Sequence, residues 1–194
     1  MSPAYRPYLP LRRVILLCAL LVPLLASGCA GKRTTLMSPA FSVYQSQSTL
    51  PILPFNNILV PTPFAETVFN DFVDDLNDNR EKAGFTTFAI IKEELGEVEK
   101  ILSPAHIYLT GEVWSYLENS GCCATELRVS SRLRIYRVRS RELLWEAEIP
   151  LESFFEHDKS ILAVEQEKLA KKLATEMARE SRRALQGAKR IQID

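Results

Sequence analysis

Three stretches in the second half of the chain alternate between apolar and polar residues. They cover residues 107–117, 126–135 and 143–151. A period of two places one face of a strand against a core and leaves the other face wetter. Turn-forming residues lie between the stretches, near 119–121 and 139–141, so the pattern predicts three antiparallel strands joined by hairpins.

Two longer segments repeat their apolar residues at helical spacing. The first covers residues 63–79, where Thr62 is a candidate N-cap and Pro63 suits the first helical position. The second covers residues 160–185 and carries arginines toward its end, where cations oppose the negative pole of the helix dipole. A coiled coil is the alternative for this last helix, but one apolar stripe beside several strands favours packing on a sheet.

The remaining elements complete an alternating order. Residues 50–55 and 85–91 are short apolar runs that predict strands, and residues 93–102 predict a short second helix. The resulting order is β-α-β-α-β-β-β-α, in which the first strands pair in parallel. We therefore expect an α+β fold, an α/β sandwich with a mixed sheet, built as one domain over residues 50–186.

The start of the chain has the three parts of a secretory signal. Three arginines precede an uncharged apolar run at residues 14–26, and small residues follow it. The run is shorter than the roughly 20 residues that a helix needs to cross a bilayer, and Pro23 interrupts it. We expect residues 1–28 to be a cleaved signal peptide and not a permanent span.

The residues Leu24-Leu25-Ala26-Ser27-Gly28-Cys29 resemble the bacterial lipobox. The resemblance implies that a lipid is attached to Cys29 and holds the protein on a membrane. Ala26 departs mildly from the family, which usually has leucine there, and an ordinary secretory signal with an unmodified Cys29 is the alternative. The residue after the cysteine is Ala30 and not the aspartate that by family analogy retains lipoproteins in the inner membrane, so we expect the periplasmic face of the outer membrane.

Composition changes the picture at the two ends of the mature chain. Residues 29–49 are rich in serine, threonine and glutamine, which predicts a flexible tether, with an edge strand around residues 40–44 as the alternative. Residues 187–194 are polar and are expected to fray. Without the signal, 21 basic residues face 24 acidic ones. This net charge of about −3 argues against a nucleic-acid partner.

Three short motifs resemble one group of periplasmic domains. Ile52-Leu53-Pro54-Phe55, Tyr108-Leu109-Thr110-Gly111-Glu112-Val113 and the hairpin from Leu133 to Trp145 are similar to the first strand, central strand and hairpin of that group. The group contains the amino-terminal domain of the Tol translocation protein, the curli-secretion lipoprotein and the activator lipoproteins of penicillin-binding proteins. The hairpin turn, Ser140-Arg141, departs from the usual threonine-glycine. The resemblance implies a lipid-tethered domain with a protein partner.

Few residues suggest chemistry. Cys122 and Cys123 are adjacent at a predicted hairpin tip, where they could form a vicinal disulfide, pair with another chain or bind a metal. A metal site would need more ligands, and His106 and His157 have no motif spacing, so we expect no metal and no cofactor. Both histidines are expected to be structural. No phosphate-binding loop or nucleophile elbow occurs, which argues against an enzyme.

Two surfaces are candidates for binding a partner. One strand face is expected to combine aromatic and basic side chains, the residue types enriched at binding hot spots. Its members are Tyr108, Trp114, Tyr116, Arg128, Arg132 and Arg134. The alternative is that helices cover both faces of the sheet. The aspartates at 71, 74, 75 and 78 form either a solvated helix face or a site for a basic partner.

These observations favour one function and leave two alternatives. We expect a lipid-anchored periplasmic adaptor that binds and regulates or assembles an envelope protein complex without catalysis. An oligomeric subunit of an outer-membrane secretion or export assembly is the second hypothesis. A small hydrolase of envelope polymers is the third, and it lacks a recognisable catalytic constellation.

Overall fold

A computed structural model describes residues 33–92, 96, 100, 102–103 and 106–192. These residues belong to the compact unit Gly31–Asp194, and the other unit, Met1–Ala30, lies outside the described residues. A six-stranded sheet has the order β1-β7-β6-β5-β3-β4, and a small second sheet pairs β2 with β8. The strands are β1 (Thr34–Met37), β2 (Ser42–Tyr44), β3 (Thr49–Ile52), β4 (Thr87–Ile90), β5 (Ile107–Ser120), β6 (Ala124–Arg137), β7 (Leu143–Glu156) and β8 (Lys189–Ile191).

The three long strands β5, β6 and β7 form the antiparallel meander that the alternating pattern predicted. Each has 14 residues, and hairpins at the predicted turns join them. Along β6, the residues from Leu127 to Ile135 alternate between buried apolar or small side chains and more exposed polar ones. The buried face belongs to a core that includes Leu133, Ile135 and Trp145.

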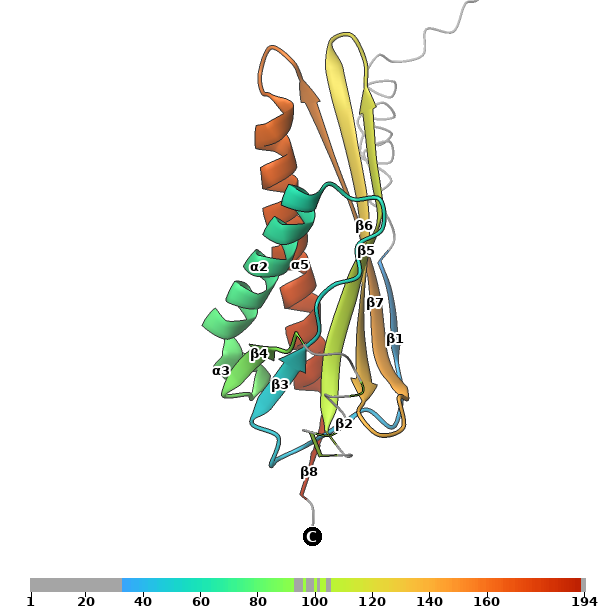
Figure 1. Ribbon diagram of the computed structural model, residues 1–194, viewed down its shortest axis with the longest axis vertical. Coiled ribbons are helices and arrows are strands. Elements are labelled where there is room, and N and C mark those ends of the chain that lie inside the picture. Colours follow the sequence, from blue (N-terminus) through green and yellow to red (C-terminus); the bar gives the residue numbers. More distant parts are fainter. Residues whose placement is uncertain (1–32, 93–95, 97–99, 101, 104–105, 193–194) are drawn as a thin grey trace, which may run out of the picture. The chain divides into compact units, whose positions relative to one another are not determined.

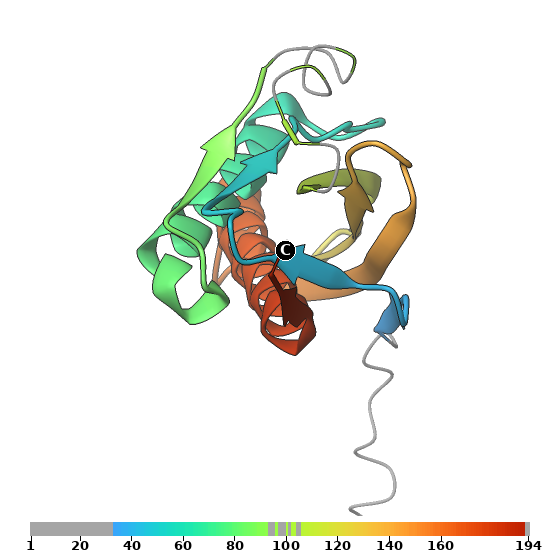
Figure 2. The ribbon, with the colours of Figure 1, turned by 90° about the horizontal axis from the view of Figure 1, so that it is seen from below.

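Two long helices cover one face of this sheet (Figure 1). Helix α2 (Thr62–Asp78) begins after Pro61, so Thr62 is its first residue and not the cap that the sequence predicted. Helix α5 (Leu162–Gly187) buries its apolar stripe, including Leu169, Leu173 and Met177. Viewed end on, the sheet curves and α5 lies along its inner side (Figure 2). This arrangement confirms the α+β fold with helices packed on a mixed sheet.

The parallel part of the sheet is short. Strand β3 lies between β4 and β5 and pairs in parallel with both. The chain then continues beside β5, where the amides of Leu53, Asn56 and Ile58 donate to its carbonyls as far as Val113. Helix α3 (Arg80–Ala83) ends at Gly84, whose φ of 74° is the left-handed conformation that glycine adopts most easily. Seven of the ten residues of the expected helix at 93–102 lie outside the described residues.

Two expectations about the ends of the domain were wrong. Within the expected tether at 29–49, β1 pairs with β7 and β2 pairs with β8, and β3 begins at Thr49. Within the expected frayed tail at 187–194, β8 pairs with β2. These segments are short, and their order comes from backbone hydrogen bonds to distant strands and from a few isolated apolar residues, such as Phe41 and Val43, that are buried in the core. The alternative of a strand near residues 40–44 corresponds to β2.

No helix in the described part of the chain has the length and apolar character needed to cross a membrane.

Candidate functional site on the outer face of the sheet

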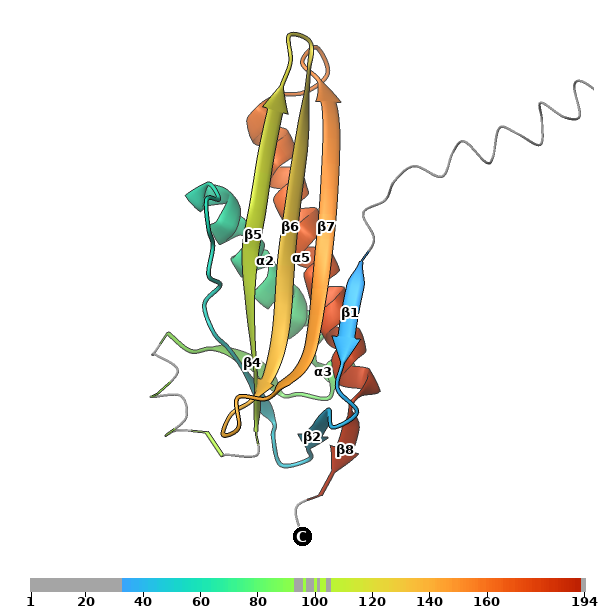
Figure 3. The ribbon, with the colours of Figure 1, turned by 90° about the vertical axis from the view of Figure 1, so that its right-hand side faces the viewer.

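Figure 3 shows the side of β5, β6 and β7 that faces away from the helices. This side carries a network of ion pairs. Arg132 donates from Nε to Glu148 at 2.9 Å and from Nη1 to Glu112 at 3.2 Å. Arg134 donates from Nε to Glu146 at 2.7 Å, and its Nη2 lies 3.2 Å from the same Glu112 oxygen. The two arginines on β6 therefore link carboxylates on both neighbouring strands.

This network favours the charged form of Arg134. Burial opposes the charge of Arg134, but its hydrogen bond to Glu146 and the charge of Glu112 outweigh burial and raise its pKa above the usual range. Arg128, farther along β6, is exposed, and its hydrogen bond to Glu126 raises its pKa. The face therefore presents permanent positive charges that are largely balanced by glutamates.

A bulge in β5 decides which aromatic side chains join this face. The pairing of β5 with β6 shifts between Val113 and Ser115, so Trp114 has no opposite residue. A bulge of this kind redirects side chains and increases local twist. The Trp114 side chain lies under the guanidinium of Arg132, 5.6 Å from it, and the residue remains 43% exposed.

Two of the predicted members are not on the exposed face, which corrects the expectation. After the bulge, Tyr116 turns toward the helices, where its ring packs 5.1 Å from Phe64 and its hydroxyl accepts a hydrogen bond from Gln166 at 2.7 Å. Burial raises the pKa of Tyr116. Tyr108 is only 3% exposed and stacks on Tyr136. The prediction failed for Tyr116 because it assumed unbroken alternation along β5. Tyr108 lies before the bulge and keeps its predicted place opposite Tyr136, but it is buried.

The structure adds two apolar residues that the sequence analysis missed. Leu117 was expected on the inner face, but the bulge moves it outward opposite Arg128, and it is 51% exposed. Phe154, opposite Glu126 on β7, is 68% exposed. We call the set of Trp114, Leu117, Phe154, Arg128, Arg132 and Arg134 the outer face. The outward position of Leu117 could not be predicted without knowing the bulge.

The hairpin between β5 and β6 carries the two adjacent cysteines. Cys122 and Cys123 are free and exposed, and their sulfur atoms lie 3.2 Å apart. A disulfide between them, or to another chain, stays a prediction. Across the described residues, no group of three or more histidine, cysteine or acidic side chains could hold a metal ion.

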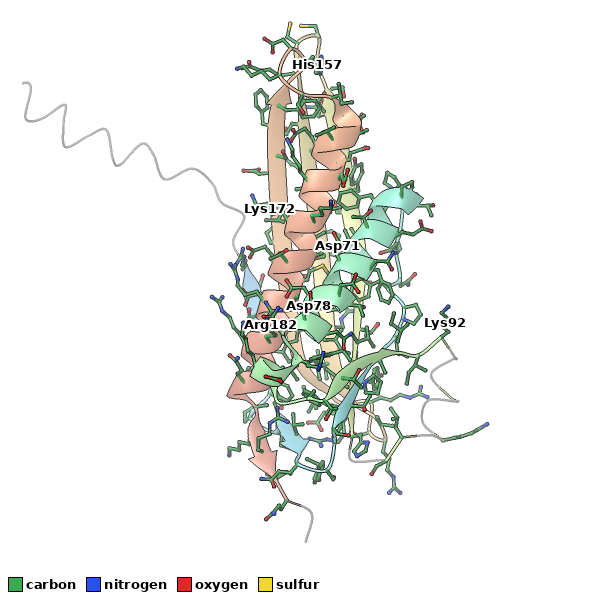
Figure 4. The ribbon with its side chains drawn as sticks, turned by 90° about the vertical axis from the view of Figure 1, so that its left-hand side faces the viewer. Asp71, Asp78, Lys92, His157, Lys172 and Arg182 are labelled. Atoms are coloured by element: carbon green, nitrogen blue, oxygen red, sulfur yellow. The ribbon has the colours of Figure 1, made fainter. Side chains whose placement is uncertain are left out.

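Near this hairpin, the fold brings together polar side chains that are distant in sequence. The Thr125 hydroxyl lies 2.9 Å from Nε2 of His157 and donates to Ser120 at 3.1 Å. All three line a hollow of about 280 Å³. Thr125 is only 2% exposed, so its hydroxyl is poorly placed to attack a polymer. The geometry fits a structural role for His157, which lies near the end of α5 where that helix begins (Figure 4).

The aspartates of α2 meet a basic residue within the same chain. Asp75 forms an ion pair with Arg182 of α5, whose side chain is 15% exposed. Asp71 and Asp78, labelled in Figure 4, lie with Lys171 around an open hollow of about 420 Å³ between the helices. Part of the acidic face therefore fastens α2 to α5, and the rest is solvated.

No family model and no curated protein matches this chain. Solved structures do resemble it. Two structures of the PelC dodecamer from Paraburkholderia phytofirmans, one of a variant, cover 76% of this chain and 96% of theirs, with TM-scores of 0.54 and 0.52 and identities of 12% and 14%. Lipoprotein GNA1162 from Neisseria meningitidis covers 68% of this chain and 99% of its own, with a TM-score of 0.43 and 12% identity.

The likeness to the two PelC structures shows the fold alone. At 12% to 14% identity, a similar backbone does not imply that the two proteins have the same binding residues. None of these three structures is named as a member of the Tol, curli or activator group, so that narrower resemblance stays a prediction.

Proposed function

We propose that this chain is an exported lipoprotein, anchored through Cys29 at the periplasmic face of the outer membrane, whose domain binds an envelope protein without catalysis. The lipobox-like residues before Cys29 support the anchor. The observation that carries the binding role is the outer face, a broad strand surface on which Trp114 and two other large apolar side chains stay exposed.

The chemistry of the outer face favours a protein partner. Tryptophan and arginine are enriched at binding hot spots, and the arginine network holds Trp114 in one orientation before a partner arrives. Exposed Leu117 and Phe154 add apolar area that association would remove from water. The near balance of arginine and glutamate on this face suits a partner with mixed charge rather than a polyanion.

A second candidate function is an oligomeric subunit of an outer-membrane export assembly. The observation that favours it is the pair of open strand edges. The segment beside β5 bonds to it only as far as Val113, and β1 pairs with β7 only up to Glu148. The β7 edge beyond that point contains Pro150, which lacks a backbone N–H and so weakens pairing with a strand of another chain. Residues Ser115 to Ser120 on β5 contain no proline, so that edge could pair with another chain. PelC is described as a dodecamer.

Crosslinking in intact cells separates the two functions. Envelopes that contain the parent chain, Trp114→Ala or Leu59→Ala are crosslinked, and the captured proteins are identified. Leu59 is 92% exposed but lies outside the outer face, which makes it a matched control. The adaptor function predicts one foreign protein that is captured by the parent and by Leu59→Ala and lost with Trp114→Ala. Capture of only this chain itself would favour the oligomeric subunit, and equal capture by all three would contradict the binding role of the outer face.

A further inference from the structure

The described domain begins very close to the proposed anchor. Arg33 is four residues after Cys29. An extended chain spans at most about 3.6 Å per residue, so the two residues cannot be more than roughly 14 Å apart. This inference rests on the proposed lipidation of Cys29, and under that condition the domain has almost no tether.

The first described residues are fastened to one side of the domain. Arg33 donates from Nη1 to Glu180 at 3.3 Å and forms an ion pair with Glu176, both on α5. The next residue, Thr34, begins β1 and pairs with Glu148 of β7. The bilayer that holds the lipid must therefore lie near the edge of the sheet formed by β1 and the adjacent side of α5.

That side of α5 is rich in basic residues. Lys172, Arg179 and Arg183 follow one another at intervals that place them on one stripe of the helix. The two glutamates that bind Arg33 lie on the same stripe, where Glu176 also pairs with Arg179 and Glu180 also pairs with Arg183. With Arg33, the stripe has four basic and two acidic side chains, a net charge of +2. In Figure 4, Lys172 lies on one side of the domain and Lys92 on the opposite side.

The edge strand beside this stripe is unusually apolar for an exposed segment. All four residues of β1 are exposed, and they include Leu36 at 60% and Met37 at 48%. Apolar side chains next to basic ones are typical of protein surfaces that lie in the headgroup region of a bilayer. Basic residues near an anionic membrane each favour binding by about fivefold, which is 1 kcal/mol.

We propose that β1 and this stripe of α5, together the anchor-side surface, lie directly on the phospholipid surface that holds the lipid of Cys29. Leu36 and Met37 project from opposite faces of this edge strand, Leu36 beside Glu146 and Met37 beside Trp145, so β1 meets the boundary between headgroups and acyl chains with its edge. Lys172 faces lipid phosphates, and Arg179 and Arg183 reach them from beside their glutamate partners. The domain is thus held in a fixed orientation, and β4, at the opposite edge of the sheet, is turned away from the membrane.

Tryptophan quenching by brominated lipids tests this orientation. The full chain, processed and lipidated in cells, is reconstituted into vesicles of phosphatidylethanolamine and phosphatidylglycerol with plain or dibrominated acyl chains. Leu36→Trp places a reporter in β1, and Ile90→Trp places the matched control in β4, where Ile90 is 42% exposed. The parent signal from Trp114 and Trp145 is subtracted. We expect brominated lipid to quench most of the added emission of Leu36→Trp and little of that of Ile90→Trp.

Charge substitutions test the basic stripe in the same samples. Lys172→Glu combined with Leu36→Trp should weaken the quenching in vesicles that contain phosphatidylglycerol. Lys92→Glu, at the opposite side, should leave it unchanged. Equal effects of the two lysine variants would overturn the role of the stripe.

The possible outcomes separate this proposal from the lipid anchor. If the protein floats with the vesicles but Leu36→Trp is quenched no more than Ile90→Trp, the anchor stands and the orientation is overturned. If the protein does not float at all, the lipid anchor itself fails. If the Leu36→Trp emission is blue-shifted but unquenched and the protein crosslinks as a dimer, a second copy covers β1 and the orientation is overturned.

Discussion

The guanidinium of Arg132 lies over the ring of Trp114 at 5.6 Å, although the two residues are on neighbouring strands and Trp114 has no paired residue opposite it. The bulge that frees Trp114 from the pairing also turns its ring under Arg132. Arg132 is held in turn by carboxylates on both sides. One exposed aromatic residue therefore packs against an arginine of the ion-pair network and not into the core.

The two tryptophans should respond differently to alanine. Trp114→Ala should change the free energy of unfolding by less than about 1 kcal/mol. The side chain of Trp114 lies at the surface and is partly solvated, so its removal leaves no cavity in the core. Trp145→Ala should cost roughly 3 to 5 kcal/mol, because that ring is 1% exposed in the core. Urea unfolding of both variants measures this difference. If the Trp114→Ala protein were as unstable as Trp145→Ala, Trp114 would serve the stability of the domain and not the binding of a partner.

Loss of the proposed lipid should release a folded protein. We expect Cys29→Ser to leave the membrane pellet after a high-salt wash, since anchoring is chemically separate from the core. Circular dichroism should show the same thermal transition as for the parent domain. A variant that stays entirely in the washed pellet would contradict the lipid anchor.

The contact between Asp75 and Arg182 should stabilise the packing of the two helices. Asp75→Asn removes the charge that Arg182 pairs with, and both side chains are mostly buried. We expect a loss of up to about 1.5 to 3 kcal/mol, the range for a hydrogen bond to a charged group. Asp74→Asn, on an exposed position of the same helix, is the control and should change stability little. Equal losses for the two variants would contradict a specific ion pair.

His106 should make stability depend on mildly acidic pH. Burial lowers its pKa below the value of 6.5 that it has when unfolded. Below pH 6.5 the unfolded chain therefore binds a proton that the folded chain does not, so stability falls as the pH decreases toward the folded pKa. His106→Gln should reduce this loss between pH 7 and pH 5, as measured by thermal unfolding. An identical pH dependence in the variant would show that other groups cause it.

The sequence by itself determined the elements whose pattern is local. The alternation along β6, from Leu127 to Ile135, predicts which side chains are buried, because successive residues of a strand face opposite sides. The apolar stripes of α2 and α5 likewise predict their inner faces, because side chains three and four residues apart share one side of a helix. These signals depend only on neighbouring residues, and the structure confirms them.

Only the tertiary structure decided the features that depend on distant partners. Strands β1, β2 and β8 are too short to carry a pattern, and they are ordered because Thr34 meets β7 and Val43 meets β8. The bulge at Trp114 depends on how β5 registers against β6, and a shift of one residue turned Tyr116 inward and Leu117 outward. Register is set by pairing across the sheet, so the composition of the outer face could not be derived from β5 alone.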